Sequence, residues 1–424
     1  MNRTLPDVTR YDLAGLVHEF GSPLYLYDFD HLRQVYQRFQ GQLHPAIDVY
    51  YAVKANPNPA IIKQFMELGS GFDLSSVGEM RLVIQLGGEP SRMSLAGPAK
   101  TDEVLREALE AQIGMLSIES LSELRSLVAI AQERQEHTAV TLRINPAQLT
   151  HGFSMKMGGV ASPFGIDEEQ LPEAVSLVQQ SPWVTITGLH VFAGTRSLDA
   201  MAIVHNVQNI VRLADQCSAT YGLRLDRINL GGGLGVPYHQ GEPELDESQV
   251  ISGINATVEA YLKHRPDTQF VMELGRYLVA SAGMYVATVV RKKQSREVTF
   301  VVLDGGMHHY LAASGNLGQV FRKNFPVCHG TKPHVRGELH TYHLVGPLCT
   351  PIDRMATNVE LPQVDEGDLL VFPRAGAYAY TASPLQFLGH PAPAEVAVCG
   401  TDVIKIRERI EHWAPHQHTC ELAG

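Results

Sequence analysis

Hydrophobic and polar positions in the central part of the chain follow a repeating rhythm. Short apolar runs of β-type residues are separated by longer stretches such as 101–111 and 119–132, whose apolar side chains fall on one helical face. Eight runs qualify as strands: 49–53, 71–74, 93–96, 115–118, 140–144, 185–191, 227–230 and 269–274. Eight such units predict an α/β fold with a closed parallel (β/α)8 barrel, whose chemistry lies at the C-terminal ends of the strands.

The pattern changes after about residue 276. Shorter β-type segments with turn signals follow, at 284–290, 298–303, 342–345 and 368–372. We therefore predict a barrel domain of residues 28–276 and a β-rich domain formed by 1–27 together with 277–424. A chain of 424 residues exceeds what one core usually supports, which fits two domains. The Gly-, Ser- and Met-rich segment 152–165 is interpreted as a mobile loop near the barrel mouth.

Composition excludes several classes of protein. A hydrophobic content of 44% and a charged content of 19% are typical of a soluble globular protein. No apolar run approaches a membrane span and the polar start is no signal peptide, so a cytoplasmic location is expected. A net charge of −11 opposes nucleic-acid binding. The five cysteines are scattered and predict free thiols without a metal site, and the histidines of 412–418 are interpreted as part of a polar terminus.

One lysine stands out against this background. Lys54 ends the apolar run 49–53 and is followed at once by Asn-Pro loop signals. In a barrel, a lysine at this place points its amine into the mouth. Burial disfavours a charged ammonium, and the neutral amine is the form that makes a Schiff base with a carbonyl cofactor. The alternative is a solvated lysine at a strand end.

Other polar or glycine residues end neighbouring runs. The glycines 231–233 follow an apolar run and leave bare backbone N–H groups for a phosphate. Glu273 and Arg276 follow another apolar run. Cys349 lies in a Gly- and Pro-framed loop, and Tyr378 lies just past a glycine turn. Taken singly, these motifs are also consistent with a flexible turn, a surface ion pair and an inert thiol.

In this order, the motifs resemble those of the pyridoxal-phosphate decarboxylases of the alanine-racemase-like fold type, the superfamily of diaminopimelate and ornithine decarboxylases. The resemblance covers about residues 23–395. It implies a (β/α)8 barrel joined to a β-rich domain, pyridoxal 5′-phosphate as cofactor, and a homodimer whose active sites are each built from both subunits. It also implies a small-molecule or carrier-bound substrate and no membrane partner.

The resemblance assigns roles residue by residue. Lys54 matches the lysine that holds the cofactor as a Schiff base, and Glu273 matches the acid that pairs with the pyridine nitrogen. Cys349 matches the cysteine from the neighbouring subunit that protonates the substrate carbon after CO₂ leaves. The other predicted cofactor-binding residues are Asp73, Phe192, Thr195, Gly232, Gly233, Gly275, Arg276 and Tyr378. Phe192 stands where the family usually has a stacking histidine, and an aromatic face can still stack there.

Departures from the family pattern concern the substrate. Diaminopimelate and ornithine decarboxylases carry an acid after the catalytic cysteine to hold the distal part of the substrate, whereas this chain has Thr350, which cannot give a charge-assisted bond to an ammonium. The segment 306–314 lacks the arginine that grasps a distal carboxylate. The predicted substrate-binding residues are Arg276, His308, His309, Thr350 and Asp353, with Arg322 as a further candidate.

These departures resemble a branch that includes the decarboxylase of the carrier-bound glutamyl group in butirosin biosynthesis. We therefore expect an α-decarboxylase of an amino-acid head on a larger or conjugated substrate, either glutamyl-carrier protein or a siderophore precursor. An acidic enzyme that meets an acidic carrier would need a local basic patch. Diaminopimelate decarboxylase, a racemase of the same fold and an inactive regulatory homologue remain as alternatives.

Overall fold

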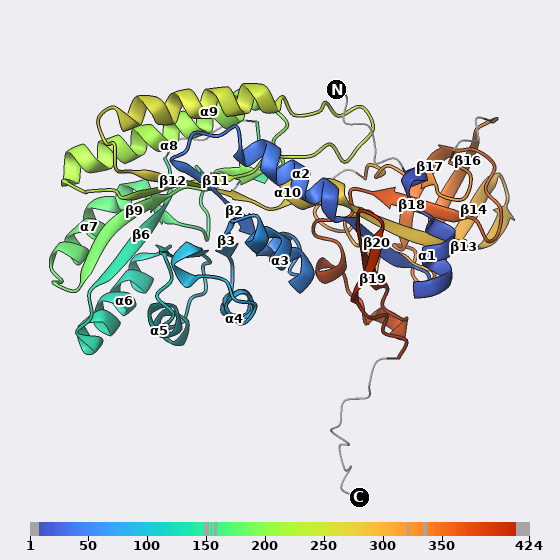
Figure 1. The fold of residues 1–424 in the computed structure, drawn as a ribbon, viewed down its shortest axis with the longest axis horizontal. Coiled ribbons are helices and arrows are strands. Elements are labelled where there is room, and N and C mark those ends of the chain that lie inside the picture. The colour runs from blue at the N-terminus through green and yellow to red at the C-terminus, as the bar shows by residue number, and fades with distance from the viewer. Residues whose placement is uncertain are drawn as a thin grey trace, which may run out of the picture. The chain divides into compact units, whose positions relative to one another are not determined.

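The computed structural model describes residues 8–147, 152–153, 155–156, 159–319, 322–333 and 337–412 (Figure 1). Its contacts divide the chain into two compact units. The barrel unit comprises His31–Pro237 and Glu242–Ala280, and the β unit comprises Met1–Asp30, Tyr238–Gly241 and Ser281–Gly424. Within the described residues, no helix is both long and apolar enough to cross a membrane.

The barrel unit is built on eight parallel strands. They are β2 (Ile47–Ala52), β3 (Gly71–Leu74), β4 (Met93–Leu95), β5 (Met115–Ile118), β6 (Thr138–Asn145), β9 (Val184–His190), β11 (Arg227–Gly232) and β12 (Gln269–Leu274). Each pairs with its neighbour in this order, and β12 pairs with β2, which closes the ring. The predicted parallel barrel is confirmed, with strand ends that differ from the prediction by at most two residues.

Helices surround the barrel strands. They are α2 (Phe29–Gln40), α3 (Pro59–Glu67), α4 (Val77–Gln85), α5 (Asp102–Glu110), α6 (Leu121–Arg134), α7 (Leu171–Gln179), α8 (Ala200–Tyr221), α9 (Glu247–Leu262) and the short α10 (Arg276–Val279). Side-chain caps fix several starts: Ser76, Thr101 and Ser120 each accept an N–H of the first turn. The long helices α8 and α9 lie side by side (Figure 1).

Several short elements lie at the barrel mouth. The 3₁₀ turn η2 (Val53–Ala55) follows β2 and carries Lys54. The strand β8 (Ile166–Asp167) pairs with the end of β6, and β7 (Met155–Lys156) pairs antiparallel with β10 (Gly194–Thr195). Part of the predicted mobile loop, residues 154, 157 and 158, lies outside the described residues, as does most of the tail 412–418.

The β unit contains a nine-stranded mixed sheet. Its strands are β1 (Leu24–Asp28), β13 (Gly283–Ser295), β14 (Val298–Leu303), β15 (Cys328–His329), β16 (His340–Val345), β17 (Arg354–Leu361), β18 (Leu369–Pro373), β19 (Ala394–Cys399) and β20 (Asp402–Arg407). The order β17-β16-β14-β13-β1-β19-β20 places the N-terminal strand inside the sheet, and β18 pairs with β13 and β15. The predicted β-rich domain is thus confirmed as an architecture.

The core of the β unit forms on one face of this sheet. Helix α1 (Leu13–Phe20) begins after Asp12, which caps it by accepting the Gly15 N–H. Its buried Leu13 and Leu16 pack with side chains of the central strands β1 and β13, among them Leu24, Leu26 and Val286. Leu369 and Val371 of β18 belong to the same core.

Candidate functional site

Lys54 and Asp73 meet at the mouth of the barrel. Lys54 Nζ donates to Asp73 Oδ2 at 2.9 Å, and Ser94 Oγ donates to Asp73 Oδ1 at 3.0 Å. Asp73 is fully buried at the third strand position of β3. Burial and the nearby charge of Glu273 raise the pKa of Asp73, while Lys54 opposes that rise. The two neighbours fix both carboxylate oxygens, so Asp73 holds the lysine amine at a defined place.

Glu273 is a second carboxylate in the same mouth, and its pKa is shifted in the opposite direction from that of Asp73. Asn229 Nδ2 donates to Glu273 Oε1, and His190 Nε2 lies 3.5 Å from Oε2. Burial alone would raise the pKa of Glu273, but His190, Lys54 and Arg143 hold it well below its ordinary value. Glu273 is therefore kept ionised, whereas burial opposes the charge of Asp73. Two acids whose pKa values are pushed apart suit two different tasks.

Three residues of this network were missed by sequence reasoning: His190, Asn229 and Arg143. His190 ends β9, and its Nδ1 lies 3.1 Å from Ser117 Oγ of β5, which directs Nε2 toward Glu273. Asn229 and Glu273 lie on the paired strands β11 and β12. A polar residue at the C-terminal end of a predicted barrel strand was the available signal.

The glycine segment after β11 has no room for side chains. Gly231 and Gly233 have φ angles of +64° and +95°, and Gly231 N donates to Asn229 Oδ1 at 2.8 Å. A Cβ atom would lie 1.9 Å from the Glu273 carbonyl oxygen at Gly232 and 2.3 Å from the Gly194 oxygen at Gly233. Only glycine fits these positions, so the backbone itself forms this surface of the mouth.

Gly275 and Arg276 continue the mouth beyond β12. A Cβ atom at Gly275 would lie 2.8 Å from Ala55 Cβ and 3.1 Å from the Ala52 oxygen, so glycine allows β12 to approach the turn that carries Lys54. Arg276 follows directly and begins α10. The strand end thus places the carboxylate of Glu273 and a guanidinium three residues apart along one turn.

Phe192 borders the lysine from the β9 side. Its ring centroid lies 5.9 Å from Lys54 Nζ and 5.9 Å from Arg143 Cζ, within the range of cation–π attraction. Arg143 in turn donates from Nη1 to the buried Glu119 at 2.8 Å. Thr195 lies in β10, two residues beyond Ala193. The structure therefore brings together Lys54, Asp73, Phe192, Gly232, Gly233, Glu273 and Gly275 at one end of the barrel unit.

The predicted residues of the β unit are His308, His309, Arg322, Cys349, Thr350, Asp353 and Tyr378. Asp353 is 2% exposed, and its carboxylate accepts the Met307 N–H at 2.7 Å and the Leu348 N–H at 2.9 Å. It thereby ties the loop that precedes His308 to the loop that precedes Cys349. A Cβ atom at Gly306 or Gly346 would lie 2.2 or 2.3 Å from this carboxylate, so both loops need glycine there.

Cys349 and Thr350 project from the loop that Asp353 holds. Cys349 is an exposed free thiol, and Thr350 is half-buried. Thr350 N donates to Leu348 O at 2.8 Å, and Asp353 N donates to Thr350 O at 3.3 Å, which closes a compact turn. Both oxygens of Asp353 are engaged by backbone, so its predicted contact with substrate stays a prediction.

The histidine pair behaves unequally. His309 is fixed by Tyr285 Oη at 3.1 Å from Nδ1 and by Pro391 O at 2.8 Å from Nε2, while its own carbonyl accepts from Tyr25. His308 is fully buried, its ring centroid lies 5.1 Å from that of His390, and neither of its ring nitrogens has a hydrogen-bond partner among the described residues. Burial, aided by His390, lowers the pKa of His308 to about 4.

Arg322 and Tyr378 complete the β-unit group. The Arg322 guanidinium donates to Ser314 O at 2.9 Å and to Arg354 O at 3.1 Å, so it binds backbone carbonyls. Tyr378 is half-buried with a φ of +52°, an uncommon conformation for a tyrosine. Its predicted phosphate contact and the predicted role of Arg276 remain predictions. No group of three His, Cys, Asp or Glu side chains within the described ranges could hold a metal ion.

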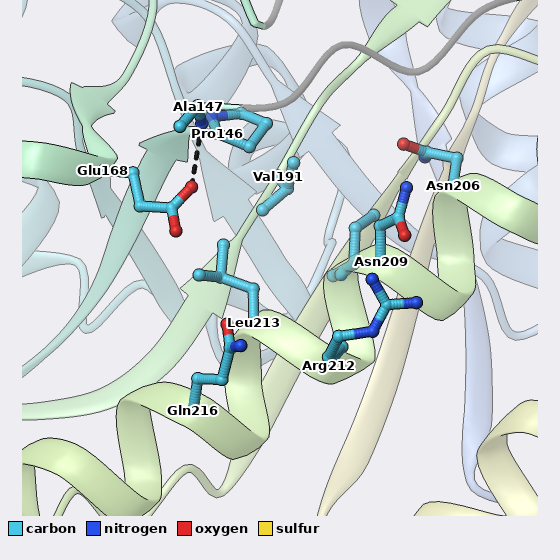
Figure 2. Close-up of a pocket in the computed structure, with 10 residues that line it drawn as sticks. Pro146, Ala147, Glu168, Val191, Asn206, Asn209, Arg212, Leu213 and Gln216 are labelled. Atoms are coloured by element: carbon cyan, nitrogen blue, oxygen red, sulfur yellow. Dashed lines mark hydrogen bonds between the residues drawn. The ribbon is translucent and has the colours of Figure 1, made fainter.

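A cavity of about 180 Å³ lies elsewhere in the barrel unit (Figure 2). It is bounded by Pro146 and Ala147 after β6 and by side chains of α8, including Arg212 (Figure 2). Glu168 accepts the Ala147 N–H at 2.8 Å at its edge. None of the predicted site residues lines this cavity.

The chain has clear relatives. The family model described as pyridoxal-dependent decarboxylase, pyridoxal binding domain, matches residues 29–280. The chain is 36% identical over 392 residues to L-glutamyl-[BtrI acyl-carrier protein] decarboxylase of Niallia circulans, covering 91% of this chain and 90% of the relative. It is 31% identical over 403 residues to diaminopimelate decarboxylase of Vibrio cholerae, covering 94% and 93%.

A solved structure is similar over nearly the whole chain. The crystal structure of diaminopimelate decarboxylase from Helicobacter pylori complexed with L-lysine aligns with a TM-score of 0.83 and 26% identity, covering 94% of this chain and 96% of that one. Both units therefore have counterparts in known proteins.

Proposed function

Because this chain belongs to the pyridoxal-dependent decarboxylase family, we propose that it removes the α-carboxyl group of an amino-acid head carried on a larger or conjugated substrate. The family, the pyridoxal-phosphate cofactor and the activity of an amino-acid decarboxylase, all predicted from the sequence, are confirmed by the family match. The substrate we favour is a glutamyl group on a carrier protein, with a siderophore precursor as a second conjugate. Release of CO₂ leaves an amine on the same conjugate.

The observation that carries this proposal is the lack of an available carboxylate in the loop of Cys349. Its sequence neighbour is Thr350, and the acid of the same loop, Asp353, has both oxygens engaged by the Met307 and Leu348 N–H groups. A substrate with a second ammonium would gain a charge-assisted bond from an available carboxylate, and this loop offers none. A glutamyl thioester has no second ammonium to satisfy.

The barrel mouth fits the cofactor. Pyridoxal phosphate, when bound, takes up the electron pair left by the departing carboxyl group. The backbone at Gly232 and Gly233 is bare where a Cβ would collide, as a phosphate cradle requires. Glu273, kept ionised by His190, is suited to hold a proton on a pyridine nitrogen. Phe192 supplies an aromatic face beside the Lys54 amine.

The proton work falls to three side chains. Lys54 Nζ, which lies 2.9 Å from Asp73, is the amine that would hold the cofactor and can carry a proton. Burial raises the pKa of Asp73, which can accept or return a proton at that amine. The Cys349 thiol donates the proton that replaces the lost carboxyl group. We also propose a homodimer in which Cys349 serves the site of the neighbouring subunit.

Substrate choice is tested by measuring CO₂ release from the purified enzyme loaded with pyridoxal phosphate. The substrates are diaminopimelate, ornithine, lysine and free glutamate beside a glutamyl-loaded acyl-carrier protein and a citryl-diaminopropionate conjugate. Turnover of a conjugate alone is the expected result. Brisk turnover of diaminopimelate would refute the role given to Thr350 and support the second candidate, diaminopimelate decarboxylase, which the 31% relative favours.

The dimer is tested by mixing two inactive variants. Lys54→Ala and Cys349→Ala chains, refolded together, should regain up to about a quarter of wild-type activity, because half of the mixed chains form dimers in which one of two sites is intact. The same variants kept apart are the control. No recovery in verified mixed dimers would place Lys54 and Cys349 in one subunit's site.

A further inference from the structure

An exposed surface of the β unit combines three cations with two apolar side chains. We call it the basic patch, and it consists of Leu317, Arg322, Lys323, Ile352 and Arg354. Leu317 is 43% and Ile352 is 49% exposed, among the more exposed large hydrophobic side chains of the described residues. The combination of apolar contact area with surrounding charge is typical of a protein-binding surface.

Hydrogen bonds join the segments that form the basic patch. Arg322 bridges them by donating to Ser314 O at 2.9 Å and to Arg354 O at 3.1 Å. Asn316 Nδ2 donates to Ile352 O at 3.1 Å. The charge of Arg354 contributes, after burial, to a lowered pKa of Arg322, which agrees with the closeness of the two guanidinium groups. The positive groups are thus held near one another despite their repulsion.

The charge of the basic patch is not balanced within the protein. Several other arginines of the chain pair with acids at 2.6 Å, as in Arg81–Glu107, Arg106–Glu133 and Arg125–Glu173. Arg322, Lys323 and Arg354 pair with no acidic side chain in the part of the chain that the structure describes. In a protein of net charge −11, these three cations form a local concentration of positive charge. It creates an attractive field for an acidic partner.

The basic patch is continuous with the loop of the reactive thiol. Ile352 and Arg354 flank Asp353, whose carboxylate holds the Leu348 N–H directly before Cys349. Arg354 N also donates to Ile352 O at 2.9 Å. A partner seated on the basic patch would therefore sit next to the residue that delivers the proton.

We propose that the basic patch docks the acidic carrier protein that presents the thioester-bound amino acid. The proposal rests on the proposed function, because a free amino acid would need no such surface. Charge complementarity supplies steering and orientation, and Leu317 and Ile352 supply apolar contact. The carrier then delivers its short arm from beside the Cys349 loop.

The test compares the same glutamyl group attached to two different thiols. The glutamyl thioester is offered either on an acyl-carrier protein or on pantetheine alone. The variant is Lys323→Glu with Arg354→Glu, since neither side chain makes a hydrogen bond or ion pair within the described structure. Arg322 is retained because it holds the loops together. The matched control is Lys293→Glu with Arg296→Glu, two exposed cations of the β13–β14 hairpin in the same unit.

The expected result is a KM about tenfold or more higher for the carrier-bound substrate in the patch variant, with little change in kcat. The KM for the pantetheine thioester should stay unchanged, and the control variant should match the wild type on both. Affinity of the enzyme for the loaded carrier, measured by fluorescence anisotropy, should fall to the same extent. In the wild type that affinity should also weaken as salt is raised.

Several outcomes would overturn the proposal. An unchanged KM for the carrier-bound substrate would remove the docking role while the decarboxylase function stands. Equal losses on both thioesters would mean that the substitutions damage the site itself. A shift from dimer to monomer in the patch variant would assign the surface to contact between copies of this chain. Failure of the wild type to act on either thioester would refute the proposed function as well.

Discussion

Replacing Asp353 should release the loop of Cys349 without unfolding the protein. In Asp353→Asn, one oxygen still accepts an N–H, but an amide NH₂ faces the other donor, so one of the two bonds at 2.7 and 2.9 Å is lost. A buried hydrogen bond to a charged acceptor contributes about 1.5–3 kcal/mol net, and an unsatisfied N–H adds to the loss. A local destabilisation of about 3 kcal/mol corresponds to a ~150-fold more frequent opening of the loop.

Hydrogen exchange followed by mass spectrometry measures this directly. The amides of Met307 and Leu348 should exchange up to ~150-fold faster in Asp353→Asn, and decarboxylation should slow because the thiol is no longer held in place. The matched control is Asp368→Asn, which removes a buried carboxylate that accepts the Asp365 N–H at 2.8 Å. That variant should speed exchange around residue 365 and near Lys332 and His329, which contact the same carboxylate, and leave Met307 and Leu348 unchanged. Unchanged exchange at Met307 and Leu348 in folded Asp353→Asn would refute the clamp.

Three further predictions concern other residues of the site. His308 has a pKa of about 4, below its ordinary value, so the unfolded chain takes up the proton first as pH falls below about 6.5. This proton uptake lowers the free energy of unfolding by up to about 3 kcal/mol between pH 6.5 and 4. Urea titrations should show a smaller loss of stability over this pH range in His308→Phe than in the wild type. Equal pH dependence of the two proteins would contradict the prediction. Glu273→Gln should lower kcat by about 10²–10³-fold with the cofactor still bound, because the negative charge beside His190 is removed. The control is Glu123→Gln, which changes a buried partner of Lys100 and should leave kcat unchanged. Similar rates in both variants would contradict the assignment. Gly233→Ala should weaken cofactor binding at least tenfold in an absorbance titration, because its Cβ would meet the Gly194 oxygen. The control is Gly222→Ala, at a φ of +67° with open space around it, which should leave cofactor binding unchanged. Equal losses in both variants would attribute the effect to backbone strain alone.

Much of the fold could be predicted because barrel strands are short apolar runs with clear ends. The strands 71–74, 115–118 and 269–274 match β3, β5 and β12 at both ends. The β6 strand begins two residues before the predicted 140, because Thr138 and Ala139 pair with β9 although they add little apolar character. Pairing, which the sequence does not display, sets these boundaries.

Lys54 and Glu273 could be proposed as site residues because each motif carries its own chemistry in the local sequence, and the structure places both in the barrel unit. His190 and Asn229 were not predicted as site residues, because they meet Glu273 only when the pairing of β9, β11 and β12 brings the strand ends together. Asp353 looked available to substrate because nothing in the local sequence shows that the Met307 and Leu348 amides point at it. Such contacts join residues 46 and 5 positions apart and depend on the folded loops.

The carboxamide of Asn229 sets a fixed length inside the barrel mouth. Its oxygen accepts the Gly231 N–H at 2.8 Å and its nitrogen donates to Glu273, so one rigid group spans the glycine turn and the carboxylate. Asn229 therefore keeps the glycine turn and the Glu273 carboxylate at a fixed separation, so that one side chain positions both.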